Sequence, residues 1–241
     1  MKIPIIFEDN YLLVIDKPAG LVVNKAESVK EETLQEWAEK KFKVQSSEFK
    51  VDKNGDFYKR AGIVHRLDKE TSGLLIIAKT PGSFEFLQAQ FKDRTVAKKY
   101  ITLAHGKLPR EGEINATVGR LPWNRERFGV LLGGREAVTF FRLLKLYKSQ
   151  GDEYFSLLEV TPQTGRTHQI RIHLKYIGHP VVSDAFYGGR KVYRRDKQFC
   201  PRLFLHATYL KIRHPKSNEW LEFRDHLPKD LEEVLLKLHN V

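Results

Sequence analysis

Apolar residues recur along the chain at two spacings, and each spacing predicts a different kind of element. Alternation of apolar and polar residues, or a short apolar run between turn residues, predicts a strand. Such patterns cover residues 3–7, 12–16, 74–78, 100–105, 113–118, 130–132, 137–147, 154–161, 203–213 and 220–223. Because only short turns separate the patterns between residues 100 and 161, we expect those strands to pair antiparallel.

Apolar residues spaced three or four apart predict helices. This spacing covers residues 34–42, 81–91, 167–177 and 228–238. A capping box made either by Ser28 and Glu31 or by Thr33 and Glu36 would start the first helix. Residues 43–61 are polar and lack periodicity, so we expect a surface loop there. Strands grouped together with few helices indicate an α+β fold and not an alternating parallel sheet.

The length and composition of the chain narrow its class. A chain of 241 residues is long enough for one substantial core or two small lobes. No internal repeat or Pro/Ser-rich linker marks a boundary, so we expect one domain over residues 1–241. No apolar run approaches the roughly 18 residues that cross a bilayer, and the start of the chain is too short in apolar residues for a signal peptide. We therefore expect a cytoplasmic protein without a membrane partner.

Charge and cysteine content point to the partner and argue against a metal. The single cysteine, Cys200, excludes an internal disulfide and a thiolate zinc cluster. His168 and His173 are five residues apart, which does not match the four-residue spacing of a helical metal pair. We expect no metal. Lysine and arginine outnumber aspartate and glutamate by 42 to 30, which suits a polyanion but also fits an ordinary basic protein.

The run HRLDKETSG at residues 65–73 carries the most chemical information. It places Asp68 between two apolar segments, where an ionised carboxylate without partners costs several kcal/mol to bury. A capping role for Asp68 in the following turn is the ordinary alternative. A buried carboxylate of this kind usually has a charged partner, a task, or both.

Together with other segments, this run resembles the RluA-type RNA pseudouridine synthases. The resemblance rests on residues 8–20, 65–73, 98–106, 134–139, 164–174, 205–207 and 214–215, in this order. It implies a pseudouridine synthase fold, with a mixed, mostly antiparallel sheet in two subdomains and a central cleft. It also implies one catalytic domain without a separate N-terminal RNA-binding domain, no cofactor, and an RNA partner.

The resemblance implies roles for individual residues. Asp68 corresponds to the essential aspartate of the family, and the reaction needs such a carboxylate as nucleophile or base. Tyr100 corresponds to the residue that stacks on the flipped uracil and takes part in proton transfer. Arg66 is similar to the residue that enters the RNA where the base has left. Arg171, on the predicted helix, is our candidate partner for Asp68, because a guanidinium orients a carboxylate.

Further residues are expected to contact RNA. Two segments, residues 120–127 and 187–199, interleave cations with aromatic residues and are interpreted as loops that bind phosphates and bases. Solvated basic loops are the alternative. The expected RNA-binding residues besides Arg66 are His65, Arg120, Arg125, Arg127, Arg166, His168, Arg190, Lys191, Arg194 and Arg195.

Two other functions compete with this hypothesis. The run at residues 65–68 superficially resembles a kinase catalytic loop, but the glycine-rich loop, the strand lysine and the Asp-Phe-Gly site are missing from the sequence. An RNA-binding protein that keeps the fold without the reaction is the stronger alternative, although Asp68, Tyr100 and Arg171 are all present. The sequence leaves ribosomal and transfer RNA open as substrates, and we take a monomer as the default.

Overall fold

The computed structural model describes residues 1–27, 29–42 and 55–241, except for the side chains of residues 125 and 126. The chain forms two compact units. The first consists of Met1–Ala97 and Tyr209–Asp225, and the second of Lys98–Thr208 and His226–Val241. The single domain expected from the sequence stays a prediction.

The first unit contains strands from both ends of the chain. Its elements are β1 (Ile5–Glu8), β2 (Leu12–Lys17), α1 (Leu34–Phe42), α2 (Asp56–Lys59), β3 (Ser72–Ala78), α3 (Pro81–Lys92), residues 209–213 of β10 (Leu205–Arg213), and β11 (Trp220–Arg224). The strand order is β1, β2, β3, β10 and β11. The pairs β1–β2, β2–β3 and β10–β11 are antiparallel.

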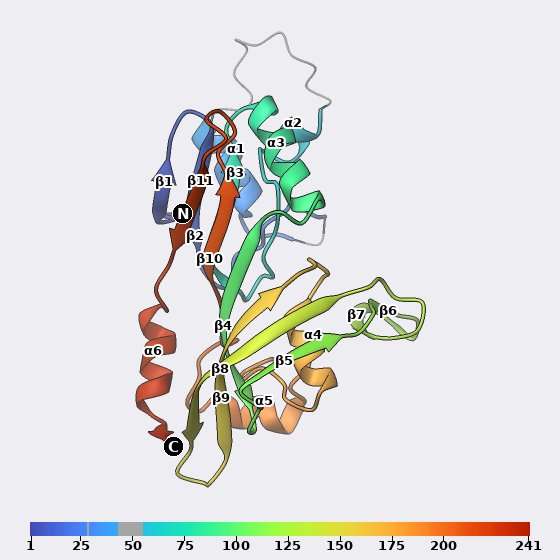
Figure 1. Cartoon of the computed structure of the whole chain (residues 1–241), viewed down its shortest axis with the longest axis vertical. Coiled ribbons are helices and arrows are strands. Elements are labelled where there is room, and N and C mark those ends of the chain that lie inside the picture. The colour runs from blue at the N-terminus through green and yellow to red at the C-terminus, as the bar shows by residue number, and fades with distance from the viewer. Residues whose placement is uncertain (28, 43–54) are drawn as a thin grey trace. The chain divides into compact units, whose positions relative to one another are not determined.

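The core of the first unit follows from the alternation of its strands. One face of β2 and β3 contributes alternate apolar residues, for example Val14 opposite Ile76. Phe84 and Leu87 of α3 pack on this face together with residues of β10 and β11, and α3 lies beside these strands in Figure 1. This helix begins where the sequence predicts, because Thr80 accepts a hydrogen bond from the Ser83 N–H at 3.2 Å.

The second unit is built around long antiparallel strands. Its elements are β4 (Ala97–His105), β5 (Glu111–Asn115), β6 (Val118–Leu121), β7 (Asn124–Val130), β8 (Val138–Lys148), β9 (Tyr154–Pro162), α4 (Gln169–Tyr176), α5 (Arg190–Asp196), the start of β10, α6 (Lys229–Leu236) and β12 (His239–Asn240). The strand order is β10, β4, β9, β8 and β12, with β5 also on β8, while β6 and β7 form a separate two-stranded sheet. Ile170 and Leu174 of α4 pack into one apolar cluster, and Leu231 and Val234 of α6 into another.

Most predicted elements are present, and several expectations need correction or qualification. The single strand expected over residues 113–118 is wrong, because β5 ends at Asn115 and β6 begins at Val118. Residues 187–199 are not a loop throughout, since they contain α5, and residues 120–127 lie in the β6–β7 hairpin. The pattern at residues 130–132 is not a strand of its own, because β7 ends at Val130. Much of the loop expected over residues 43–61, and Ser28, fall outside the described residues, and α2 was not predicted. The capping box of Thr33 and Glu36 is confirmed, with reciprocal bonds of 2.8 and 3.3 Å.

Among the residues that the structure describes, no helix combines the length and the apolar content needed to cross a bilayer.

The approach to β3 depends on a glycine. Gly62 has a φ of +76°, its carbonyl accepts a hydrogen bond from the Ala78 N–H at 2.8 Å, and a Cβ at this position would stand 2.0 Å from the Ala78 oxygen. We predict that Gly62→Ala destabilises the protein by about 2 kcal/mol or more, because left-handed strain and a backbone clash add. Urea unfolding measures this change.

Gly82→Ala is the matched control for this prediction. Gly82 lies in the first turn of α3, and a Cβ there would meet nothing within 4 Å. Alanine should therefore be neutral or stabilise the helix slightly. Equal unfolding midpoints for the two variants would contradict the assignment of Gly62 as a required glycine.

Candidate active site

Asp68 lies in an irregular loop that leads into β3. The loop begins after Ile63, which forms an isolated bridge with Ile77, and ends where β3 starts at Ser72. Asp68 is half-buried, and its carbonyl accepts a hydrogen bond from the Thr71 N–H at 3.2 Å. The turn that the ordinary alternative proposed is therefore present, made by the main chain of Asp68.

A buried lysine fixes the residue next to Asp68. The Lys17 ammonium is fully buried and donates to the carbonyls of Pro18, Leu21 and Lys69 at 2.8, 2.9 and 3.1 Å. The Lys69 carbonyl also accepts from the Gly20 N–H at 2.8 Å. An ammonium has three protons, so these contacts satisfy all of its donors. Lys17 had no role in the prediction from sequence, although a lysine and a proline directly after a buried strand were a usable signal.

The two residues expected to contact RNA beside Asp68 have different surroundings. The His65 ring stacks on Phe91, with 4.5 Å between centroids, and its Nε2 accepts from the Ile76 N–H at 3.0 Å. These contacts hold the ring against the first unit. Arg66 is exposed. RNA contact by either residue stays a prediction.

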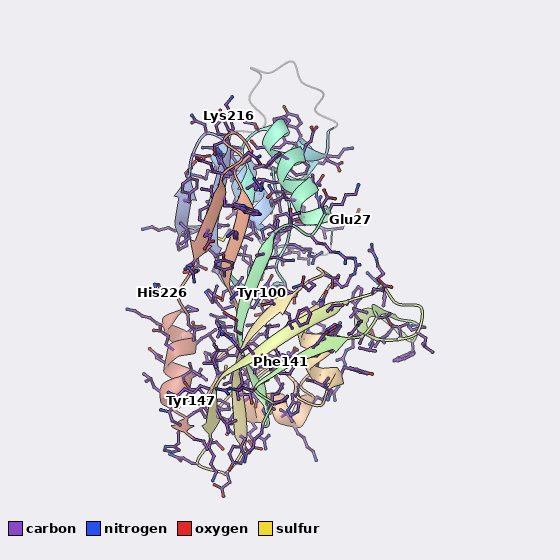
Figure 2. The ribbon with its side chains drawn as sticks, viewed as in Figure 1. Glu27, Tyr100, Phe141, Tyr147, Lys216 and His226 are labelled. Carbon is purple, nitrogen blue, oxygen red and sulfur yellow. The ribbon has the colours of Figure 1, made fainter. Side chains whose placement is uncertain are left out.

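Tyr100 lies on β4 of the second unit, opposite Val160 of β9. It is half-buried and packs against the apolar cluster that includes Phe141. Figure 2 labels both residues. Lys98 precedes Tyr100 by two residues and therefore occupies the same face of the strand. Burial lowers the pKa of the Lys98 ammonium. Lys98 was not predicted as a candidate, because the cations at the start of this strand carry no individual signal in the sequence.

Arg171 is a buried residue of α4 that makes a two-pronged contact with one carboxylate. Its Nε and Nη2 donate to Oδ2 and Oδ1 of Asp184 at 2.8 and 2.9 Å, and both residues are almost completely buried. Asp184 Oδ1 also accepts from the backbone N–H groups of Phe186 and Tyr187 at 2.9 and 3.0 Å. The expected partner, Asp68, belongs to the other unit, so that pairing stays a prediction.

Asp184 is a functional candidate that was not predicted from the sequence. Its local signal was an acidic residue soon after the apolar pair Val181 and Val182. The structure brings it to Arg171, thirteen residues earlier in the chain.

His168 and Arg166 stand at the start of α4. His168 is the N-cap residue with a φ of +55°, and its Nδ1 lies 2.8 Å from the Tyr187 hydroxyl. The centroid of its ring lies 6.2 Å from that of Phe128 on β7 and 5.9 Å from that of Phe186. Arg166 donates from Nε to the carbonyl of Glu136 at 3.1 Å.

The two basic segments expected to bind RNA have secondary structure that was not predicted. Arg120 and Arg127 are exposed on the β6–β7 hairpin, where the Arg120 guanidinium lies 5.1 Å from the centroid of Phe128. The side chain of Arg125 falls outside the described residues. On α5 the exposed cations are Arg190, Lys191, Arg194 and Arg195. Arg195 pairs with Glu153 at 2.6 Å.

One buried carboxylate ties α5 to the rest of the second unit. Asp196 Oδ2 accepts from the Ser183 N–H at 2.8 Å and lies 2.9 Å from Nε2 of His105 on β4. The C-terminal end of α5 is thereby fixed, which leaves its cations facing solvent.

Comparison with known proteins finds a matching family and several relatives. The model of the family described as RNA pseudouridylate synthase matches residues 11–176. The chain is 46% identical to an uncharacterized RNA pseudouridine synthase of Chloroflexus aurantiacus, over 75% of this chain and 54% of that protein, so it spans about half of that relative. It is 38% identical to ribosomal large subunit pseudouridine synthase D of Nitrosomonas europaea, over 100% of this chain and 67% of that protein.

Solved structures agree with the sequence relatives. The fold is similar to that of human RNA pseudouridylate synthase domain containing 1, with a TM-score of 0.75 and 26% identity over 100% of this chain and 89% of that one. Human RNA pseudouridylate synthase domain containing 4 gives a TM-score of 0.69 at 22% identity, over 98% and 94% of the two chains. The expected α+β fold with a mixed, mostly antiparallel sheet is confirmed.

The Arg171–Asp184 pair generates a prediction about stability. Asp184→Asn should destabilise the protein by about 3 kcal/mol or more, because it removes the negative charge that makes the two-pronged contact with a buried guanidinium. Asp152→Asn is the control, since Asp152 is 83% exposed and pairs with Lys148 at 2.8 Å on the surface. Urea unfolding should show a large loss for the first variant and almost none for the second. Equal losses would mean that the buried pair does not stabilise the fold.

Proposed function

This chain belongs to the RNA pseudouridylate synthase family, and we propose that it isomerises uridines of structured RNA to pseudouridine. The observation that carries the proposal is the position of Asp68, a half-buried carboxylate in a loop whose backbone is fixed by Lys17 through Lys69. A fixed backbone limits the positions that the Asp68 carboxylate takes, which favours its action on a bound nucleoside.

The proposed reaction is an intramolecular rearrangement. The bond between ribose C1′ and uracil N1 breaks, the uracil turns, and C1′ joins uracil C5, which gives up its proton while N1 gains one. The atoms and electrons balance without an oxidant or reductant. Asp68 would attack the base, attack the ribose, or abstract a proton from the ribose, and each route uses a carboxylate as nucleophile or base.

Tyr100, Arg171 and Arg66 have distinct roles in this proposal. Tyr100 stacks on the uracil that has left the RNA helix, and its phenol serves the proton transfer. Arg171 supplies a guanidinium that orients a carboxylate, for which its fixed geometry is suited. Arg66, being exposed and planar, fills the space that the flipped base leaves.

Among RNA classes, we propose ribosomal RNA of the large subunit. The support is similarity over the whole of this chain, and over 67% of the relative, to the Nitrosomonas europaea protein, whose name assigns it to the large ribosomal subunit. The net charge of +12 suits binding to a long polyanion. The direct experiment is to map pseudouridines in ribosomal and transfer RNA from cells with and without this protein. Loss of a site in transfer RNA alone would overturn the ribosomal assignment, and no change in either RNA would favour a non-catalytic RNA-binding protein.

We predict that Asp68→Asn abolishes isomerisation and preserves folding and RNA affinity, because an amide of nearly the same shape is neither nucleophile nor base. The single-turnover rate at saturating RNA should fall by more than about 100-fold, the low end of an acid–base contribution. Asp93→Asn, at the exposed C-cap of α3, is the control and should react like the wild type. A smaller decrease for Asp68→Asn would remove Asp68 from the reaction.

The cations of α5 give a prediction about binding. Replacing Arg190, Lys191, Arg194 and Arg195 with glutamine keeps helix propensity and removes four charges. If these residues contact phosphates, the slope of log affinity against log salt should shrink by about 0.7–0.9 for each phosphate that the protein no longer neutralises. The rate at saturating RNA should change far less.

A second variant with the same decrease in charge is the control. Its glutamines replace the exposed residues Lys2, Lys30, Lys216 and Lys229. If the slope shrinks equally in both variants, net charge and not α5 determines binding. If the α5 variant keeps the wild-type salt slope but loses most of its single-turnover rate at saturating RNA, α5 would instead be part of the catalytic machinery.

A further inference from the structure

An exposed aromatic ring stands beside the buried Arg171–Asp184 pair. Phe186 is 43% exposed, yet its backbone N–H is held by Asp184 Oδ1 at 2.9 Å. The Arg171 guanidinium lies 5.6 Å from the centroid of its ring. One carboxylate therefore fixes both the main chain of Phe186 and the cation next to its ring.

The neighbours of Phe186 form an aromatic cluster, which consists of Phe128, His168, Phe186 and Tyr187. The centroids of His168 and Phe186 are 5.9 Å apart, and those of Phe186 and Tyr187 are 6.4 Å apart. Tyr187 is itself fixed by its hydroxyl contact with His168 and by the Asp184 carboxylate. Phe186 has only two side-chain torsions and its main chain is held by Asp184, so ordering its ring against a ligand costs little conformational entropy.

An exposed aromatic ring on a fixed main chain presents a flat apolar face to a ligand. We propose that Phe186 is a stacking platform for one unpaired nucleobase of the RNA, an inference that rests on the proposed function. A nucleobase presents a flat π face that stacks on an aromatic ring without regard to sequence. The exposed Arg120, whose guanidinium lies 5.1 Å from the centroid of Phe128, matches the negative charge of the RNA backbone.

A protein partner fits this position less well than a base. Phe186 is the exposed member of the aromatic cluster, and the other three members are half-buried. A protein interface needs a wider apolar centre than one exposed ring. The distance from Phe186 to α5, the proposed phosphate-binding helix, is short along the chain, since α5 begins at Arg190. One RNA strand can therefore place its phosphates on α5 and one base on Phe186.

The test measures the affinity for RNA as a function of salt, using transcribed large-subunit ribosomal RNA and a single-stranded oligouridine as probes. Phe186→Ala should weaken binding by about 5- to 150-fold, which corresponds to the free energy of one stacked base. The slope of log affinity against log salt should not change, because no charge is removed. The affinity of Phe186→Ala should therefore be lower by the same factor at every salt concentration. The α5 variant, in contrast, should show a smaller slope.

Two further substitutions separate stacking from apolar contact and from folding. Phe186→Leu keeps an apolar side chain without a π face and should bind as weakly as the alanine variant, with an unchanged unfolding midpoint. Phe186→Trp keeps the aromatic face and should bind like the wild type. Tyr176→Ala is the matched control, because Tyr176 is a 61% exposed aromatic residue at the end of α4.

Each outcome decides the proposal. The stacking platform would be overturned if Phe186→Ala binds RNA as tightly as Tyr176→Ala, or if Phe186→Leu binds as tightly as Phe186→Trp. This holds even if the wild-type protein isomerises uridine. Conversely, if Phe186→Ala binds RNA more weakly but the wild-type protein converts no uridine, the stacking platform is retained and the proposed reaction is overturned. A wild-type protein that binds neither probe would overturn both.

Discussion

The second unit is organised by the buried ion pair between Arg171 and Asp184. Taking two charges out of water is expensive, and the cost is offset only if their geometry and remaining hydrogen bonds are good. Here the guanidinium makes two contacts with one carboxylate, and that carboxylate also accepts two backbone N–H groups. The orientation of Arg171, the path of the chain after Asp184, and the exposed ring of Phe186 all depend on this one pair.

The first unit uses the same physical principle with a different cation. Lys17 is fully buried, and three carbonyl oxygens accept its protons. Because one of those oxygens belongs to Lys69, the solvation of a buried ammonium determines where the residue after Asp68 lies. In both units a buried cation therefore positions a candidate functional segment, and an apolar residue of the same size would leave several carbonyls or carboxylate oxygens unsatisfied.

The cations proposed to bind RNA lie on two kinds of structural element. The α5 cations project from a helix whose end is fixed by the buried Asp196, whereas Arg120 and Arg127 project from a two-stranded hairpin. The aromatic cluster of Phe128, His168, Phe186 and Tyr187 includes residues from the hairpin, from the start of α4 and from the segment before α5. In the proposed complex, α5 contributes electrostatic attraction and Phe186 contributes stacking, and salt dependence separates the two because only the first depends on charge.

The local elements and the family could be predicted from the residues alone. β2 and β3 follow from short apolar runs, and α3 and α4 from the spacing of their apolar residues, because the buried residues of each element lie close together in the chain. Periodicity did not predict α5, whose seven residues are mostly charged and whose end is held by contacts of Asp196 with Ser183 and His105. Likewise, nothing local assigns Asp184 to Arg171 or three carbonyls to Lys17. These contacts emerge only when the chain is folded, because the free energy that selects a partner for a buried charge depends on which distant groups share its water-free site.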